Sequence, residues 1–330
     1  MINILDINEI SLDEAVKART FDLFLGYLCN ETRSIHVLKR AYEHCANKVL
    51  LVEARTNGTG LPHPRWAKKA EQIEVIFRED ELADELLEAS VTDRLNSIGD
   101  IGAPISILLD ISSMPRAVMA SIMATFEDIA ATRQVDMLVA YCLAKYTPPL
   151  ERNPANKTVK PVHPSFTGFS IAPGLPVAAI VGLGYEKGKA LGAVEYVESS
   201  DWWVFVPTSE EKKYFKKVEQ HNQTILNVIG ADRKFEYSIH SPLLTTARLE
   251  SLVASLSFTH KTVLLPFGPK IFFFCSLLVA LVHKTCAVWH VTGEMPASRA
   301  DVSPSAFVMC LSFTLAASNA APSISITETT

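Results

Sequence analysis

Short, almost continuously apolar runs recur along the chain and alternate with longer segments of mixed polarity. The runs at residues 21–27, 105–110 and 135–142 contain few polar positions, which is typical of strands in a sheet that is buried on both faces. The segments between the runs have the length and the pattern of helices. Strands that alternate with helices predict a mostly parallel, doubly wound α/β sheet.

The same succession of segments occurs again in the second half of the chain. Gly26 corresponds to Gly182, and Pro115 to Pro269, at nearly equal spacing. The matched segments are 21–27 with 177–185, 48–60 with 201–211, 73–77 with 235–239, 105–128 with 262–284, and 135–142 with 286–293. We predict two tandem Rossmann-like domains related by an internal repeat, at residues 1–150 and 165–330, with a proline-rich linker at 151–164. One large α/β domain with an accidental internal similarity is the alternative.

The composition agrees with two packed domains. The 330 residues suggest two domains of ordinary size, and hydrophobic residues at 48% with charged residues at 20% allow packed cores. The formal net charge of −5 argues against a protein that coats DNA or RNA in general, although it is compatible with a small basic pocket.

The cysteines and the most apolar stretch bear on where the protein resides. The six cysteines form no CxxC pair and lie mostly inside apolar runs, which indicates buried, reduced thiols in a cytoplasmic protein. The acidic N-terminal stretch lacks the pattern of a signal peptide. Residues 271–283 are apolar but fall short of the roughly 20 residues that span a membrane. We therefore expect a buried helix there and no membrane association.

The most distinctive polar residues follow the strand at 105–110. Asp110, Ser112 and Ser113 precede Pro115 and Arg116, and an apolar helical segment begins at that point. Unpaired N–H groups at a helix start, with a cation in the first turn, favour a phosphate. This turn is therefore a candidate anion site. The alternative is an ordinary strand-to-helix turn in which a serine caps the helix and Arg116 lies in solvent.

The second half of the chain carries a simpler version of this turn, in residues 266–270. It keeps a proline and a cation but has no aspartate and no serine. Gly268 and Lys270 are the candidate ligand-binding residues there. The shared features suggest a shared role, and the differences suggest that the two pockets are not equivalent.

A tyrosine and a cation follow the first strand of each half. Tyr27 precedes Arg33, and Tyr185 precedes Lys189. A tyrosine ring can stack on a base, and a nearby cation can bind a phosphate, so these four residues complete the candidate ligand-binding set. Alternatively, the tyrosines are half-buried packing residues and the cations belong to solvated helix faces.

Several signatures of enzymes are missing from the sequence. We find no dinucleotide-binding glycine motif, no Walker lysine, no nucleophile elbow and no clustered metal ligands. We therefore expect no cofactor and no metal. If the chain is a base–sugar hydrolase, Glu53, before a loop that contains glycine, is the candidate carboxylate at the floor of the pocket.

Residues 110–116 resemble the motif Asp-[Ile/Leu]-Thr-Gly-Gly-Thr-Lys of CRISPR-associated Rossmann-fold (CARF) sensor domains. Asp110 matches the aspartate, Ser112 the first threonine and Arg116 the lysine, whereas the residues between them depart from the glycines and the second threonine. In that family two domains pair, and their facing pockets bind a cyclic oligoadenylate second messenger. The resemblance implies that two fused copies form this pseudo-dimer within one chain.

Three functions remain open from the sequence. The first is a subunit of an antiviral defence system that senses a nucleotide or second messenger, or that serves in assembly, and that acts through a partner effector protein. The second is an enzyme acting on nucleotides, either a cyclic oligonucleotide phosphodiesterase that uses Arg116 and Lys270 or a base–sugar hydrolase that uses Glu53. The third is a structural scaffold whose pockets bind nothing.

Overall fold

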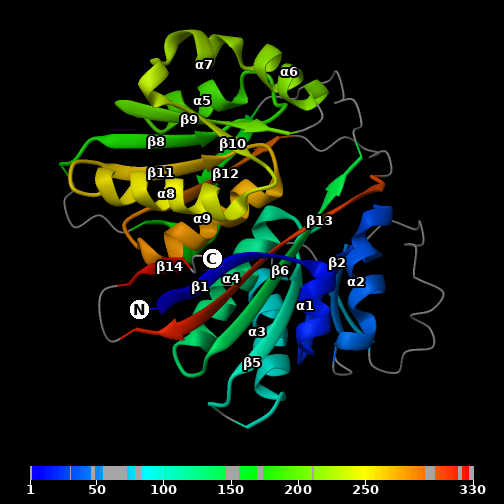
Figure 1. Cartoon of the computed structure of the whole chain (residues 1–330). Coiled ribbons are helices and arrows are strands. Elements are labelled where there is room, and N and C mark those ends of the chain that lie inside the picture. Colours follow the sequence, from blue (N-terminus) through cyan, green and yellow to red (C-terminus); the bar gives the residue numbers. More distant parts are fainter. Residues whose placement is uncertain are drawn as a thin grey trace. The chain divides into compact units, whose positions relative to one another are not determined.

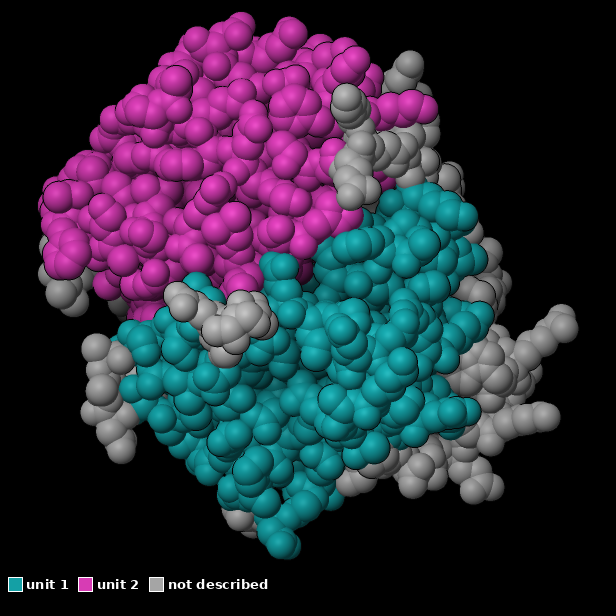
Figure 2. Space-filling model, viewed as in Figure 1, with its two compact units in different colours: residues 1–147, 299–330 teal, residues 148–298 magenta. Residues whose placement is uncertain are grey.

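The chain forms two compact units in the computed structural model (Figures 1 and 2). The first comprises residues 1–147 with 299–330, and the second comprises residues 148–298. The described residues are 2–29, 31–45, 49–54, 73–78, 83–100, 102–145, 156–168, 174–209, 212–293, 302–318 and 322–326. Each unit is an α/β fold of its own.

Within the described residues, the first unit is built on an eight-stranded mixed sheet with the order β14-β1-β13-β6-β5-β2-β3-β4. The strands are β1 (Ile2–Ser11), β2 (Leu23–Leu28), β3 (Val49–Ala54), β4 (Ile73–Arg78), β5 (Ile105–Asp110), β6 (Val135–Ala144), β13 (Pro304–Ala317) and β14 (Ile324–Ile326). Strands β2 to β6 are mutually parallel, and β13 pairs antiparallel with both β6 and β1. Every residue of β2 is buried, as expected for a central strand of a sheet covered on both faces.

One helix of the first unit precedes the first strand that the sequence predicts, and the others follow β2, β4 and β5. They are α1 (Leu12–Ala18), η1 (Thr32–Ile35), α2 (His36–Ala41), η2 (Tyr42–His44), α3 (Ala83–Asn96) and α4 (Arg116–Ala130). Ser11 begins α1 with a capping box, in which its hydroxyl accepts from the Glu14 N–H while the Glu14 carboxylate accepts from the Ser11 N–H. Apolar residues of α1 and α2 form one core cluster with those of β2, β5 and β6.

The second unit holds a six-stranded sheet in its described part, with the order β10-β9-β8-β11-β12-β7. The strands are β7 (Asn156–Pro161), β8 (Val177–Gly182), β9 (Asp201–Thr208), β10 (Lys234–Ser238), β11 (Lys261–Pro266) and β12 (Ala287–Gly293). The helices are η4 (Pro164–Phe166), α5 (Lys189–Tyr196), α6 (Lys212–His221), α7 (Gln223–Val228), η5 (Ala231–Arg233), α8 (Pro242–Leu256) and α9 (Lys270–Val282). Strands β8 to β12 are parallel, and β7 adds an antiparallel edge.

The five parallel strands have the same order in both units. In the first unit β2 lies next to β3 on one side and β5 on the other, and in the second unit β8 lies between β9 and β11 in the same way. The chain therefore changes direction across the sheet between β2 and β5, and again between β8 and β11. Such a switch point is where open α/β sheets bind ligands, at the carboxyl ends of the strands.

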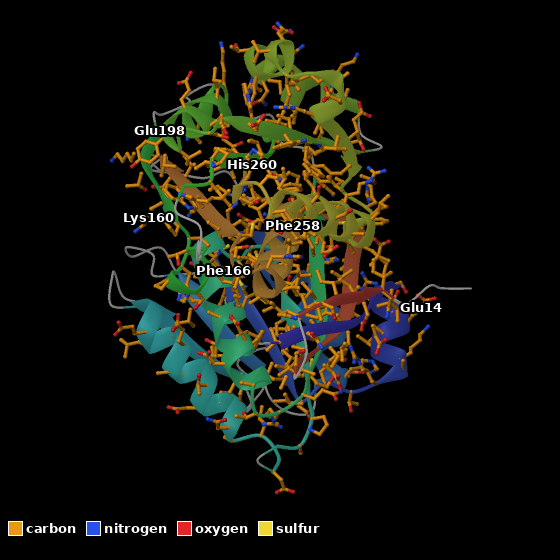
Figure 3. The ribbon with its side chains drawn as sticks, turned by 90° about the vertical axis from the view of Figure 1, so that its left-hand side faces the viewer. Glu14, Lys160, Phe166, Glu198, Phe258 and His260 are labelled. Atoms are coloured by element: carbon orange, nitrogen blue, oxygen red, sulfur yellow. The ribbon has the colours of Figure 1, made fainter. Side chains whose placement is uncertain are left out.

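The division into units differs from the expected domains at both ends of the second half. Residues 299–330, expected in the second domain, join the first unit, because β13 completes the first sheet between β6 and β1. The expected linker 151–164 contains β7, which forms the antiparallel edge of the second sheet. Directly after β7, the side chain of Phe166 is fully buried (Figure 3), so this stretch belongs to a packed core.

The apolar segment near residue 275 forms α9, as predicted. Its residues from Ile271 to Val282 are all buried, and the helix contacts β11 and β12. A Cβ atom on Gly182 would lie 2.2 Å from the ring of Phe272, so only glycine lets α9 approach β8 this closely. In the part of the chain that the structure describes, no helix is both long and apolar enough to cross a membrane.

A polar cluster ties together the amino ends of three strands in the second unit. Arg233 donates to Asp201 at 2.6 Å, and His260 Nε2 lies 3.2 Å from the other oxygen of the same carboxylate. The guanidinium of Arg233 also lies over the ring of Trp203 at 5.1 Å. Hydrogen bonds from Arg233 and His260 lower the pKa of Asp201. His260 (Figure 3) and Arg233 therefore fasten the starts of β10 and β11 to β9.

Arg133 closes the end of α3 in the first unit. Its side chain is 7% exposed. Its guanidinium donates to the carbonyl of Ala103 at 2.7 Å and to those of Leu95 and Ile98 at 3.2 Å each. A cation at the C-terminal end of a helix satisfies terminal carbonyls and interacts favourably with the helix dipole.

We expect Arg133→Ala to lower the free energy of unfolding by about 3 kcal/mol, because it leaves buried carbonyls without their charged donor. Arg133→Lys keeps the charge but cannot reach all three carbonyls, so it loses an intermediate amount. Urea unfolding of both variants measures this, with Lys39→Ala, at an exposed position of α2, as the control. An Arg133→Ala protein with wild-type stability would show that Arg133 does not support α3.

Candidate functional site

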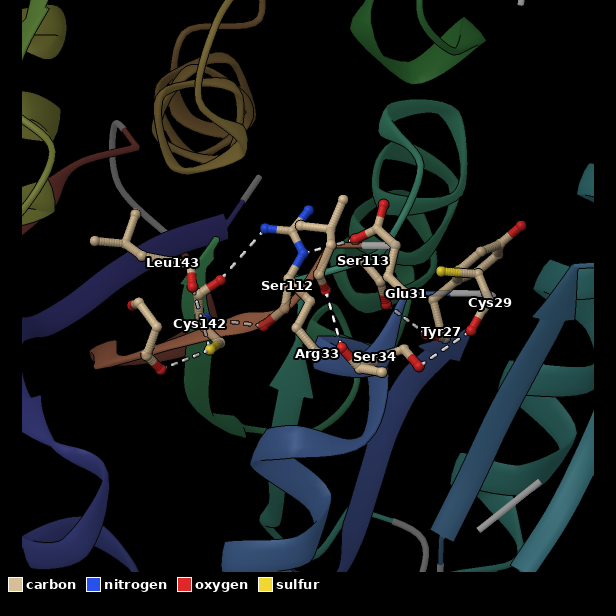
Figure 4. A network of polar contacts seen from close by, with 12 residues as sticks. Tyr27, Cys29, Glu31, Arg33, Ser34, Ser112, Ser113, Cys142 and Leu143 are labelled. Atoms are coloured by element: carbon tan, nitrogen blue, oxygen red, sulfur yellow. Dashed lines mark hydrogen bonds and ion pairs between the residues drawn. The ribbon is translucent and has the colours of Figure 1, made fainter. Parts of the chain in front are cut away.

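The candidate residues of the first unit gather at the switch point between β2 and β5. Asp110 ends β5, and the turn after it leads to Arg116, the first residue of α4. Tyr27 lies near the carboxyl end of β2, and Arg33 lies in η1, which follows that strand. Hydrogen bonds connect Tyr27 with Ser113, and Arg33 and Ser112 with Cys142 (Figure 4).

Asp110 and Ser112 hold the turn to the neighbouring strand β6. One carboxylate oxygen of Asp110 accepts the Ser112 N–H at 2.9 Å and also the Ser112 hydroxyl. The hydroxyl oxygen of Ser112 in turn accepts the N–H of Cys142 at 2.8 Å. All three residues are buried, so the aspartate and the serine shape the turn rather than face solvent.

Ser113 bridges the switch point itself. Its hydroxyl donates to the carbonyl of Tyr27 at 2.5 Å (Figure 4), and both residues are buried. Tyr27 is only 7% exposed, which fits a packing residue better than a face for base stacking. Ser113 and Tyr27 therefore join the end of β2 to the turn after β5.

Arg33 points into the protein. Its Nε lies 2.6 Å from a carboxylate oxygen of Glu31, and its guanidinium also reaches the carbonyl of Cys142 at 3.5 Å. Burial works against the charged form of Arg33, but Tyr141 and Glu31 outweigh it and raise the pKa of the guanidinium. The charge of Arg33 is thus balanced inside the protein. The backbone N–H of Arg33 itself donates to the carbonyl of Val302 at 3.3 Å.

Arg116 begins α4 without help from either serine. Pro115 is the N-cap residue, with φ −62° and ψ 149°, and no side chain caps the helix. The alternative in which a serine caps α4 is therefore wrong, because both hydroxyls bond other groups, Asp110 and the Tyr27 carbonyl. Arg116 is partly exposed and stands at the positive end of a 15-residue helix.

The second unit builds the corresponding turn from backbone alone. Gly268 has φ +77°, and a Cβ atom on it would lie 2.3 Å from the carbonyl oxygen of Leu183. Pro269 then caps α9 with φ −60° and ψ 139°, again without a side-chain cap, and Lys270 is the first helical residue. Gly268 therefore contacts the carbonyl that follows β8, much as Ser113 bonds the carbonyl near the end of β2.

The turn after β8 is held from α6 and α7. Asn222 donates to the carbonyl of Gly184 at 2.8 Å, and His221 bonds the carbonyl of Tyr185. The ring of Tyr185 stacks on Tyr214 with centroids 5.7 Å apart. Lys189, partly exposed, begins α5 after Gly188, which has φ +72°.

The structure thus gathers most of the candidate residues of each unit at one switch point and changes the interpretation of some. Arg116, Lys189 and Lys270 stand at helix starts and are partly exposed, whereas Tyr27 and Arg33 are buried. The side chain of Glu53 and the loop after it lie outside the residues whose side chains are described. Among the described residues, no group of three or more His, Cys, Asp or Glu side chains is arranged to hold a metal ion.

The sequence gives little signal for the partners that complete the site. Val302 accepts a hydrogen bond from Thr32, 270 positions away along the chain, and Cys142 lies on a strand with the sequence pattern of ordinary core. Glu31 could have been found, because a carboxylate two residues before Arg33 is a natural ion-pair partner.

No family model matches the chain, and no curated protein matches it.

Three buried cysteines of the first unit are inert thiols. Burial raises the pKa of Cys142 to about 11, with a further contribution from the charge of Asp110, and it raises the pKa of Cys45 and Cys310 to about 12. At neutral pH these side chains are therefore neutral and have no thiolate to act as a nucleophile.

We expect Ser112→Ala to lower the free energy of unfolding by about 1–3 kcal/mol, because the buried N–H of Cys142 loses its acceptor. Urea unfolding measures the loss. Ser97→Ala, at an exposed position, is the matched control and should change stability by less than about 0.5 kcal/mol. Equal free energies of unfolding for the two variants would show that Ser112 does not stabilise the turn.

The buried thiols also predict a loss of stability at high pH. These thiols ionise near pH 9.0 when the chain is unfolded, whereas burial keeps them protonated to higher pH in the folded protein. Their contribution to the free energy of unfolding is therefore complete below pH 9 and is lost as the pH rises toward 11 to 12. Each thiol adds a slope of up to about −1.4 kcal/mol per pH unit. Between pH 8 and pH 10 the free energy of unfolding should therefore fall less in Cys45→Ala/Cys310→Ala than in the wild type. Identical losses would contradict the raised pKa values.

Proposed function

We propose that the chain is a subunit that senses a nucleotide or second messenger, or that serves in assembly. It binds a phosphate-bearing ligand and acts through a partner protein. One observation carries this proposal. In each unit the strand beside the central one, β5 or β11, runs into a proline-capped helix whose first residue is a cation, Arg116 in α4 and Lys270 in α9, with no side-chain cap.

The electrostatics of these turns favour an anion. The N-terminal end of a helix carries a partial positive charge, so a cation at the first helical position is less favourable there than a neutral or acidic residue. Arg116 and Lys270 both occupy that position. A phosphate bound at the turn would interact favourably with the dipole, with the backbone N–H groups and with the cation at once. The location at a switch point is where the fold binds ligands.

The contacts at the first site favour binding over catalysis. The hydroxyls of Ser112 and Ser113 and one oxygen of Asp110 are used to form the turn. A nucleophile or a general base would need to reach the substrate, and these side chains are buried among their own partners. These three side chains therefore form the framework of the turn, which supports a site that binds a ligand without using them to react with it.

The resemblance of residues 110–116 to CARF sensor domains supports a more specific version. Under that version the two units derive from an internal repeat, the ligand is a cyclic oligonucleotide, and the protein works with an effector in antiviral defence. The equal order of the parallel strands in the two sheets agrees with a repeat. The resemblance rests on three matched residues, Asp110, Ser112 and Arg116.

Calorimetric titration with cyclic and linear oligoadenylates tests the proposal. Arg116→Ala removes one charge-assisted contact, on the order of 1.5–3 kcal/mol, or about 10- to 150-fold in affinity. Arg116→Lys should recover only part of this, because the bidentate fork is absent. Lys270→Ala should weaken any binding at the second turn in the same way.

Thermal melts and a charge-matched variant serve as controls. Lys39→Ala removes an exposed cation on α2 and should leave binding unchanged, and all variants should melt close to the wild type. The proposal fails if Arg116→Ala melts several degrees lower while its ligand affinity is unchanged, or if no oligoadenylate binds the wild type.

A further inference from the structure

Helix α6 presents a row of lysines beside the second switch point. Its sequence is Lys-Lys-Tyr-Phe-Lys-Lys-Val-Glu-Gln-His. Lys213 and Lys216 are exposed, and Lys217 is partly exposed. The opposite side of the helix is used for packing, because Val218 is buried in the core of the second unit and Phe215 packs against that core. The spacing of three and four residues places the lysines together on the outer side.

An aromatic pair lies at the start of this row. Tyr214 of α6 stacks on Tyr185, with ring centroids 5.7 Å apart and an angle of 27° between the rings. His221, at the other end of α6, bonds the carbonyl of Tyr185. Tyr185 is therefore held from two places, and it supports the partly exposed ring of Tyr214.

The charge of this surface is opposite to that of the whole chain. The net charge of the protein is −5, but the described side chains of α6 include Lys213, Lys216 and Lys217 against one carboxylate, Glu219. In the described part of the chain, no ion pair links Lys213, Lys216 or Lys217 to a carboxylate. Lys187 lies two residues beyond Tyr185 and is exposed. Glu210 and Glu211, which precede α6, lie outside the described residues.

We propose that the outer side of α6 binds single-stranded nucleic acid. The lysines would contact successive phosphates of the backbone, and Tyr214 would stack on one base. Adjacent cations and a supported aromatic ring are the combination that binds such strands, because every base has a face that can stack. A membrane is a poorer partner, since α6 has its apolar side buried in the protein core.

This interaction goes beyond the proposed function and does not depend on it. The proposed ligand sites lie at the starts of α4 and α9, whereas this surface lies along α6. A strand bound here would be recognised through its backbone and through stacking, so we expect little preference for sequence.

Fluorescence anisotropy with a labelled 12-nucleotide single-stranded DNA, and with RNA of the same sequence, tests the proposal. Lys213→Ala/Lys216→Ala should weaken binding and reduce the slope of log K against log salt concentration by about 1.4, or about 0.7 for each phosphate that a lysine no longer neutralises. Tyr214→Ala should weaken binding about 5- to 150-fold. Tyr214→Phe should bind as the wild type does, because stacking does not need the hydroxyl.

A matched control separates a local surface from the effect of total charge. Lys39→Ala/Lys160→Ala removes the same charge from two exposed positions, on α2 and on β7 (Figure 3), and should bind as the wild type does. The proposal is overturned if the two double variants bind equally, if Tyr214→Ala binds normally while folded by circular dichroism, or if the wild type binds neither strand. A duplex of the same sequence that binds as tightly would also overturn it.

The outcome is distinct from that of the proposed function. Loss of oligoadenylate binding in Arg116→Ala or Lys270→Ala tests the turns at α4 and α9, and those variants keep every lysine of α6. Strand binding that survives in Arg116→Ala/Lys270→Ala and disappears in Lys213→Ala/Lys216→Ala would support the α6 surface alone.

Discussion

A backbone carbonyl at the carboxyl end of the central parallel strand, β2 or β8, is the point around which each candidate site is built. The strands on both sides of β2 and of β8 are parallel to it, and the turn that follows β5 or β11 lies against this end of the central strand. In the first unit the hydroxyl of Ser113 donates to the carbonyl of Tyr27. In the second unit Gly268 packs against the carbonyl of Leu183 at a distance that no Cβ atom would allow. The turn therefore approaches the end of the central strand closely in both units, through a hydrogen bond in the first and through a residue without a side chain in the second.

The turns after β5 and β11 follow from that contact. Each passes the carbonyl, reaches a proline in extended conformation and starts a helix with a cation. Other polar groups at the first turn are buried and bonded to their neighbours, whereas Arg116 and Lys270 remain partly exposed. Buried charges elsewhere in the first unit have partners. Arg33 pairs with Glu31, and Arg133 donates to three carbonyls, as the cost of burying an unpaired charge requires.

The path of the chain makes the first unit depend on its last residues. Strand β13 pairs with β6 on one side and with β1 on the other, so the first sheet lacks an interior strand until residues 304–317 are present. The N–H of Lys145 donates to the carbonyl of Ser303, and β7 pairs with β12 in the second unit. The segments that leave and re-enter the first unit are therefore anchored by antiparallel pairing. The second unit is inserted into the first rather than appended to it.

The sequence by itself determined the α/β class and most elements of both sheets, because strands buried on both faces are nearly continuous in apolar residues and their helices keep a regular period. It also located the turns at Arg116 and Lys270, since proline and a cation at a helix start are local signals. Only the tertiary structure decided that residues 304–317 belong to the first sheet and β7 to the second. It also decided that Arg33 and Tyr27 are buried. Strand partners and burial depend on residues distant in sequence, such as Val302 beside Thr32. A local pattern of polarity does not determine which distant segment packs against a given strand or turn.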